Sequence, residues 1–128
     1  MKVVIIMGSE SDRDFAQKII KELEKYSISY DINVASAHKQ PLEVLNILKS
    51  YTAEKGVVYI TIAGRSNALS GFVAANSNSP VIACPPFKDK TDMLVNIHST
   101  LQMPSNVPVL TILDPGNCAL AVKRILEL

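Results

Sequence analysis

The chain has 128 residues, of which 48% are apolar and 20% charged, a size and composition that fit one globular domain and exclude a disordered chain. Thirteen Lys and Arg residues against twelve Asp and Glu residues give a formal net charge of +1, which excludes a basic field for nucleic acid and an acidic tail. Apolar stretches such as Val3–Met7 are far shorter than the ~20 residues of a membrane span, so we expect no membrane partner.

Strand-like and helical patterns alternate along the chain. Continuous β-branched runs indicate strands, and apolar residues three or four apart indicate helices. Ser11 with Asp14 resembles a capping box, and Pro41 suits the first turn of a helix. The first half predicts strands at 2–7, 30–34 and 57–62 and helices at 12–26, 41–51 and 68–75. The second half predicts strands at 80–84 and 109–113, a helix capped by Asp89 or Thr91 that carries Met93, Leu94, Ile97 and Leu101, and a helix at 117–126.

This uninterrupted alternation of strand and helix predicts an α/β fold. Strands that are apolar on both faces are typical of a parallel sheet covered by helices on each side. Five strand–helix units are too few for an eight-fold barrel. We therefore expect a three-layer sandwich around a five-stranded parallel sheet in the flavodoxin-like (Rossmann-like) order 2-1-3-4-5, with residues 1–128 forming a single domain.

In such a sheet, ligands bind beyond the carboxyl ends of the strands. The unusual polar residues of this chain fall in the loops that follow those ends, whereas the opposite loops have the composition of ordinary surface connections. The ligand-side loops are Gly8–Asp12, Ser36–Lys39, Gly64–Asn67, Pro86–Lys88 and Asp114–Asn117.

The Gly8–Asp12 loop precedes a helix, so it offers free backbone N–H groups and two hydroxyls to a phosphate. Asp12 adds a carboxylate that can accept hydrogen bonds from ribose hydroxyls. The alternative interpretation is that Ser11 and Asp12 only cap the helix, which leaves Gly8 and Ser9 unexplained. The loop has no GxGxxG pattern and the chain has no P-loop, so neither dinucleotide nor P-loop chemistry is predicted.

The Ser36–Lys39 loop contains His38, one of only two histidines. A histidine titrates near neutral pH and can take a proton and return it, and Lys39 offers a cation to a carboxylate or phosphate. The alternative interpretation is a solvated His-Lys turn. We favour function over that alternative because the loop lies at the ligand end of the sheet.

The Gly64–Asn67 loop combines a glycine, a hydroxyl and a guanidinium at another helix N-terminus. Arg65 is suited to two-pronged binding of a carboxylate or phosphate. The alternative interpretation is a tight turn with Asn67 as the helix cap and Arg65 at the surface. His98 is expected to flank its helix, and Lys88-Asp89-Lys90 to form a solvated loop.

Cys84 and Cys118 have neither CxxC spacing nor a nearby histidine, so we expect two buried thiols in a reducing compartment and no metal site. Met1 opens directly on a strand-like run, and no signal peptide is visible. The expected location is the cytoplasm.

Three segments, in this order, resemble the signature segments of the aminoimidazole ribonucleotide (AIR) carboxylases of purine biosynthesis. They are Gly8-Ser9-Glu10-Ser11-Asp12, Ser36-Ala37-His38-Lys39 and Ser99-Thr100-Leu101-Gln102-Met103-Pro104. Two further segments, Ala63–Gly71 and Pro80–Pro86, are similar to the class II branch of PurE-like proteins, which uses CO2 directly. The second His before Leu-Pro-Gly that marks the bacterial mutase branch is absent.

The resemblance implies a carboxy-lyase that reversibly carboxylates AIR with CO2 to the 4-carboxylate, with no cofactor and no metal. His38 would be the general acid/base, and Lys39 would hold the nascent carboxylate. Gly64, Arg65 and Ser66 would form the pocket for CO2 or the carboxylate. The substrate-binding residues expected in all are Ser9, Ser11, Asp12, Ser36, Lys39, Gly64, Arg65, Ser66 and Asn67.

Three other interpretations were weighed. Within the family, the alternative is the N5-carboxyaminoimidazole ribonucleotide mutase, which the absent second histidine disfavours. From another class, the chain can be a catalytically idle ribonucleotide-binding module. A phospho-acceptor domain requires an Asp after the third strand, and Ile62-Ala63-Gly64 supplies none. The expected partners are the small-molecule substrate and further copies of the chain, in a tetramer or octamer.

Overall fold

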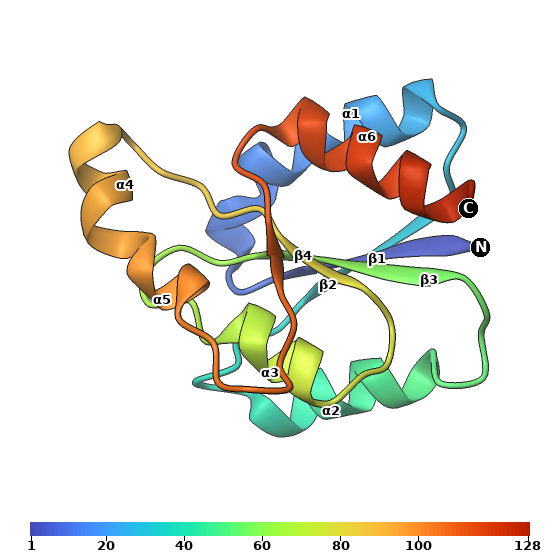
Figure 1. Cartoon of the computed structure of the whole chain (residues 1–128), viewed down its shortest axis with the longest axis horizontal. Coiled ribbons are helices and arrows are strands. Elements are labelled where there is room, and N and C mark those ends of the chain that lie inside the picture. The colour runs from blue at the N-terminus through green and yellow to red at the C-terminus, as the bar shows by residue number, and fades with distance from the viewer.

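The computed structural model describes residues 1–128, and its five strands form one parallel sheet in the order β2-β1-β3-β4-β5. This is the predicted order (Figure 1). The strands are β1 Lys2–Met7, β2 Tyr30–Val34, β3 Val57–Ile62, β4 Val81–Ala83 and β5 Leu110–Thr111. The helices are α1 Arg13–Lys25, α2 Pro41–Ser50, α3 Leu69–Ala75, α4 Lys90–Asn96, α5 His98–Leu101 and α6 Pro115–Leu126, with a 3-10 turn, η1, at Glu10–Asp12.

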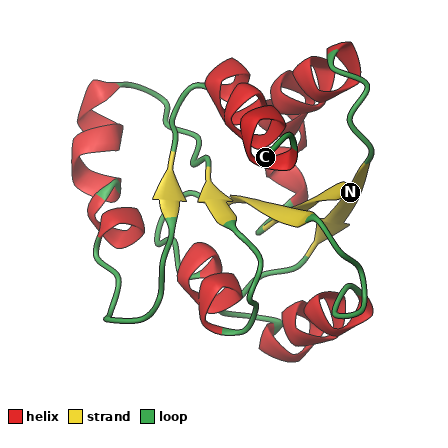
Figure 2. Cartoon of the chain, turned by 45° about the vertical axis from the view of Figure 1, so that its right-hand side comes forward, coloured by secondary structure: helices red, strands yellow, loops and turns green.

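Helices cover both faces of the sheet, and each face has its own core. Helices α1 and α6 lie on one face and α2 and α3 on the other, as Figures 1 and 2 show. Strand β1 supplies both cores because its side chains alternate: Val3, Ile5 and Met7 pack under α1 and α6. Its other residues, Val4 and Ile6, pack against α2 and α3. This two-sided burial explains why the strands are almost continuously apolar.

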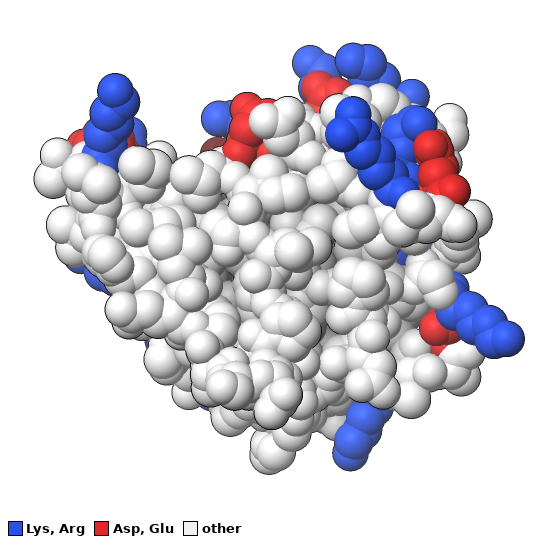
Figure 3. All heavy atoms as spheres, viewed as in Figure 1, with Lys and Arg blue, Asp and Glu red and all other residues white.

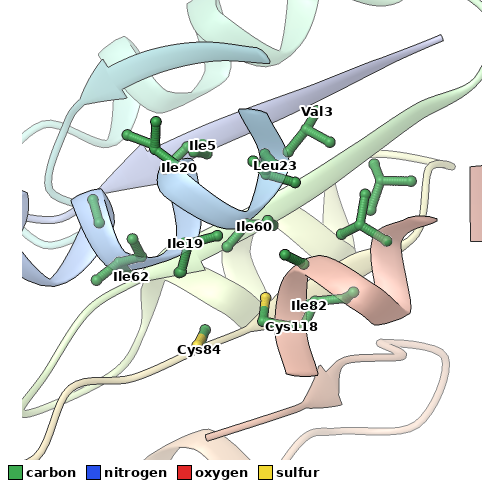
Figure 4. Close-up of a cluster of buried hydrophobic side chains, with 14 of the residues drawn as sticks. Val3, Ile5, Ile19, Ile20, Leu23, Ile60, Ile62, Ile82, Cys84 and Cys118 are labelled. Atoms are coloured by element: carbon green, nitrogen blue, oxygen red, sulfur yellow. The ribbon is translucent and has the colours of Figure 1, made fainter. Parts of the chain in front are cut away.

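Both cysteines lie in the core under α1 and α6, near Ile62 and Ile82 (Figure 4). Cys84 follows β4, Cys118 is in α6, and neither is exposed or paired in a disulfide. The hydrogen bond with Cys84, followed by burial, raises the pKa of Cys118 far above its usual value, so this thiol stays protonated. The expected pair of buried thiols is therefore what the fold contains.

Helices α4 and α5 differ from the prediction. The sequence predicts one helix whose apolar stripe joins the core, but two short helices meet at Ile97 and lie beside the sheet rather than over a face (Figures 1 and 2). No residue of α4 is buried, and Leu94 and Leu101 are 63% and 58% exposed. Strand β4 has three residues and strand β5 has two, so this side of the sheet is too small for a further helix to pack on its face.

Strand β5 is shorter than the predicted 109–113. Only Leu110 and Thr111 pair with β4, and one further backbone bond runs from Ile112 N to Ala83 O at 3.0 Å. As the edge strand, it cannot extend beyond its three-residue neighbour. Asp114 caps α6 by accepting from the Asn117 backbone at 2.8 Å, and the helix begins two residues earlier than predicted. No helix of the fold is both long and apolar enough to cross a bilayer.

Candidate active site

The loops that follow β1, β2 and β3 meet at the carboxyl end of the sheet and enclose a cavity of about 220 Å³. Backbone contacts hold the loops together, since Gly8 N donates to Ile62 O and Ala35 N donates to Met7 O, both at 2.9 Å. The cavity is lined by Gly8, Ser9, Asp12, Ser36, Ala37, His38, Lys39, Ala63, Gly64, Arg65, Ser66, Ala68 and Leu69. Three separate stretches of sequence therefore build one site.

The Gly8–Asp12 loop begins the site, but its capping differs from the prediction. The Ser9 hydroxyl accepts from the Ser11 backbone at 3.2 Å and lies 2.9 Å from the Ser11 hydroxyl, which starts the 3-10 turn η1. Asp12 stands at the N-cap of α1 without a side-chain cap bond. The predicted capping box of Ser11 with Asp14 is therefore wrong, because the hydroxyl cap forms one turn earlier. Ser11 is exposed and does not line the cavity.

Asp12 is half-buried in the cavity wall. Burial raises the pKa of its carboxyl above the usual value, and a hydrogen bond from the Ser9 backbone opposes this to a smaller extent. No cation is paired with it. A partly desolvated carboxylate without a cation destabilises the free protein at a position that faces a ligand.

We expect Asp12→Asn to raise the melting temperature of the free protein by about 1–3 °C at pH 7. The folded-state pKa lies above the unfolded value, so the penalty is present above the folded pKa and disappears as the pH falls through it. The gain should therefore shrink on going from pH 7 towards pH 4. Differential scanning calorimetry at both pH values measures it, with Asp14→Asn, an exposed carboxylate in the same helix, as the control. An equal gain at both pH values contradicts the expectation.

The loop after β2 presents His38 and Lys39 at the cavity mouth, where both are exposed. Ser36 shapes the turn: its hydroxyl accepts from Lys39 N at 3.2 Å, and its carbonyl accepts from Gln40 N at 2.7 Å. Pro41 then opens α2 at its first position. The imidazole and the ammonium are thus carried on a hydrogen-bonded turn whose side chains are free for a ligand.

The loop after β3 divides into an exposed tip and a buried anchor. Gly64, Arg65 and Ser66 line the cavity, whereas Asn67 is 4% exposed and does not. The Asn67 amide donates to the Thr100 hydroxyl at 3.0 Å, and its carbonyl oxygen accepts from Ser70 N at 3.2 Å. Asn67 therefore accepts a hydrogen bond from the first turn of α3, whose N-cap is the next residue, Ala68, and it does not line the cavity.

The sequence segment from Ser99 onward contributes from behind this loop. The Ser99 hydroxyl accepts from Asn67 N at 2.9 Å and donates to Asn96 O at 3.0 Å. Thr100 is buried beside the Asn67 amide. Helix α5 thereby fixes the backbone that carries Gly64 and Arg65. His98 is exposed at the start of α5 and does not line the cavity.

A second hollow of about 430 Å³ adjoins the first, with Gly64 and Arg65 lining both. The loop after β4 and helix α4 form its other walls, through Pro86, Phe87, Lys88, Asp92 and Asn96. Arg65 Nη2 lies 3.3 Å from Asp92 Oδ1 across this hollow. Asp92 is not among the residues that the sequence predicts for the site, and Lys88-Asp89-Lys90 just before it are predicted to form a solvated loop. The signal that could have identified Asp92 is its place in the first turn of a helix, three residues after the cap Asp89.

Another hollow, of about 380 Å³, lies at the opposite edge of the sheet between α2 and α3. Its charged lining residue is Glu54, and Tyr51 there donates its hydroxyl to Asp31 at 2.6 Å. No cation faces it, so it is a poor place for an anion. No group of three or more His, Cys, Asp or Glu side chains is placed to hold a metal ion. The cavity at the carboxyl edge therefore remains the candidate site.

The cavity combines an imidazole, a side chain suited to general acid–base chemistry, with several hydrogen-bond donors. His38 supplies the proton chemistry, and Lys39 and Arg65 supply positive charge. Ser9, Ser36 and Ser66 add hydroxyls, and two helix N-termini begin close by. Such a set suits a small anion that gains or loses a proton while it is bound.

Comparisons with known proteins find relatives that match nearly the whole chain. The AIR carboxylase family model matches residues 2–128. A phosphoribosylaminoimidazole carboxylase of Archaeoglobus fulgidus is 51% identical over 128 residues, which are all of this chain and 70% of that protein. An N5-carboxyaminoimidazole ribonucleotide mutase of Methanocaldococcus jannaschii is 41% identical, over 98% of this chain and 79% of that protein. The crystal structure of Treponema denticola PurE has a TM-score of 0.91 and 45% identity, over 98% of this chain and 80% of that one.

Proposed function

The chain belongs to the AIR carboxylase family, and we propose that it catalyses the reversible carboxylation of 5-aminoimidazole ribonucleotide by CO2 in purine biosynthesis. The product is 4-carboxyaminoimidazole ribonucleotide, and the enzyme class is a carboxy-lyase. The observation that carries the proposal is that His38, Lys39 and the Gly64–Ser66 tip line one cavity. A proton-transfer group and anion-binding groups therefore face the same volume.

His38 is the proposed general acid/base. The C4 carbon of the aminoimidazole ring attacks the carbon of CO2, a C–C bond forms, and the ring carbon becomes tetrahedral with its hydrogen still attached. The imidazole takes that proton, and the ring electrons return to restore aromaticity. In the reverse direction the imidazolium protonates C4, and CO2 leaves. Proton transfer of this kind contributes typically ~10²–10⁴ in rate.

The charge that develops on the carboxylate oxygens needs local stabilisation, because the chain has a formal net charge of only +1. We assign this role to Lys39 on one side of the cavity and to the Gly64–Ser66 tip, with the Arg65 guanidinium, on the other. Donors that are fixed before the reaction stabilise charge without reorganising during it. The anchoring of Asn67 behind the tip meets that requirement.

The ribose phosphate is placed at the start of α1. Ser9 and Ser36 offer hydroxyls there, Asp12 accepts from ribose hydroxyls, and the N-terminus of α1 follows directly after η1. Ser11 contributes through Ser9, whose hydroxyl it holds at 2.9 Å, rather than through the cavity wall. The phosphate thereby fixes the nucleotide so that its ring lies between His38 and Arg65.

The mutase activity is the second candidate, because a relative named as that mutase is 41% identical to this chain. That activity would move the carboxylate from the ring amine to C4. The second histidine expected of the mutase branch has no counterpart in the cavity, where His38 is the sole imidazole. The carboxylase is therefore preferred.

One substrate comparison tests the proposal. The purified protein is given 4-carboxyaminoimidazole ribonucleotide, and loss of the carboxylate is followed by ultraviolet absorbance; the forward reaction is run with 5-aminoimidazole ribonucleotide at several bicarbonate and CO2 concentrations. We expect decarboxylation and a CO2-dependent forward rate. Turnover solely from the N5-carboxylated nucleotide would assign the mutase, and binding without turnover would leave an idle module.

We further propose that the protein works as a homo-oligomer, a tetramer or an octamer. Five of the nine large apolar side chains that are exposed lie on α4, α5 and the segment around β5: Leu94, Val95, Leu101, Leu110 and Leu113. Figure 3 shows that charged side chains lie mainly at the margins of the view that contains these elements. Several exposed apolar side chains on a face with few charges are typical of an interface between subunits.

We expect Leu94→Glu to weaken this association by about ten-fold or more, because an unpaired carboxylate is costly to bury. Size-exclusion chromatography with light scattering over a dilution series measures the effect. Leu42→Glu is the matched control, since Leu42 is 73% exposed on α2, away from this surface. Equal mass distributions for the two variants would show that the interface lies elsewhere.

A further inference from the structure

The one acidic side chain that contacts Arg65 is Asp92, on helix α4. It lies outside the cavity proposed to hold the nucleotide and lines the adjoining hollow instead. The two residues are 27 positions apart in the sequence, and the ion pair joins the loop after β3 to the start of α4. This contact is separate from the Asn67 anchors, which hold the backbone of the same loop.

Asp92 is itself firmly held. Its carboxylate accepts from Lys88 N at 2.9 Å, from the Asn96 side chain and from Arg65 Nη2 at 3.3 Å. Its own backbone N–H donates to the cap residue Asp89 at 2.8 Å. The hydrogen bond from Lys88 and the charge of Arg65 lower the pKa of Asp92, so it is ionised at neutral pH. The carboxylate is therefore a fixed acceptor, set in place before any ligand arrives.

Arg65 has little else to hold it. Its side chain is 74% exposed, against 19% for Asp92, and no other hydrogen bond to the guanidinium is present. A guanidinium has five N–H donors in a rigid fork, and Asp92 occupies one nitrogen. The remaining donors stay free at the boundary of the two hollows, where Gly64 and Arg65 line both.

We propose that Asp92 is a positioning residue that aims the Arg65 guanidinium at the carboxylate of the carboxylated nucleotide, an inference that rests on the proposed function. Without Asp92, the long Arg65 side chain samples many rotamers, and ordering it opposes binding. The contribution is selective, because the uncarboxylated nucleotide has no carboxylate for Arg65 to hold and its phosphate is assigned to the start of α1. Asp92 therefore distinguishes the two sides of the reaction.

Equilibrium binding to the full chain carrying His38→Asn, which prevents turnover, tests this inference. Isothermal titration calorimetry measures the dissociation constants of 4-carboxyaminoimidazole ribonucleotide and of 5-aminoimidazole ribonucleotide, with and without Asp92→Asn. For an exposed ion pair, we expect Asp92→Asn to raise the dissociation constant of 4-carboxyaminoimidazole ribonucleotide by about five-fold. The dissociation constant of 5-aminoimidazole ribonucleotide should change by less than about two-fold. A structural role alone would weaken both nucleotides alike.

Asp89→Asn is the matched control. It makes the same charge change at the same end of α4 and keeps a good helix cap. Asp89 lines a hollow that Arg65 also lines, but its carboxylate forms no ion pair with Arg65. We expect no selective loss with it. If Asp89→Asn also weakened binding of the carboxylated nucleotide alone, the effect would come from the loss of any negative charge near α4, and the inference would be overturned. Equal affinities with and without Asp92→Asn would also overturn it, and failure of the parent protein, with His38 intact, to bind either nucleotide would overturn the proposed function itself.

Discussion

Replacing His38 by Asn is expected to lower the turnover of 4-carboxyaminoimidazole ribonucleotide by about 10²–10⁴-fold. His38 is the one histidine in the cavity wall. Imidazole is the side chain that most often serves as general acid and base in enzymes, and an amide can serve as neither. Asn keeps a similar shape and hydrogen-bonding ability, and His38 is exposed, so the fold should remain intact. Absorbance assays at saturating nucleotide measure the loss in kcat.

The second histidine provides the control. His98 is also exposed but stands at the start of α5, outside the cavity, so His98→Asn should turn over within about two-fold of the parent. Nucleotide binding by His38→Asn should persist, because the phosphate and carboxylate are held by other groups. Full turnover by His38→Asn would remove the acid/base assignment, and loss of nucleotide binding would make His38 a binding residue.

Replacing Asn67 by Ala is expected to lower the free energy of unfolding by about 2–3 kcal/mol. The change removes two hydrogen bonds at a buried position and leaves the Thr100 hydroxyl and the Ser70 N–H without their partner. Because the Gly64–Ser66 tip loses its anchor, turnover should fall as well. Urea denaturation followed by circular dichroism measures the stability.

Asn76→Ala is the matched control, at the other end of α3. The Asn76 side chain also donates to a backbone oxygen, that of Phe72 at 2.8 Å, but the residue is exposed. Water replaces that bond, so the expected cost is below about 1 kcal/mol. If the two variants lost similar amounts of unfolding free energy, the buried hydrogen bonds of Asn67 would contribute no more to stability than the exposed one of Asn76.

Several features of the fold could be predicted because they depend on local pattern. Lys2–Met7 and Val57–Ile62 are too continuously apolar for anything but central strands, and both form the predicted strands over the same residues. The polar loops after them could be assigned to one edge of the sheet because parallel strands all end on the same side. The meeting of His38 with the Gly64–Ser66 tip in one cavity follows from that topology.

The features whose surroundings the sequence did not predict depend on contacts between distant segments. The apolar stripe of Leu94 and Leu101 has the spacing of a core helix, yet both residues are exposed because the short β4 and β5 leave no sheet face to receive them. Asn67 stands in a polar loop of the kind that binds ligands, yet it is buried because it contacts Ser99 and Thr100, more than thirty positions away. No local pattern contains that information.

The sequence by itself determined the α/β class through its periodicity, and through the direction of the chain it determined the edge of the sheet that holds the candidate site. The strand order was the one expected of that fold class, and the structure confirms it. The tertiary structure decided which polar residues face the cavity and which support it. Ser9, His38 and Arg65 line it, whereas Asn67 and Asp92 hold the loop from outside. The physical reason is that hydrophobic burial follows a short sequence period, while a hydrogen bond joins residues that the fold brings together from any distance along the chain.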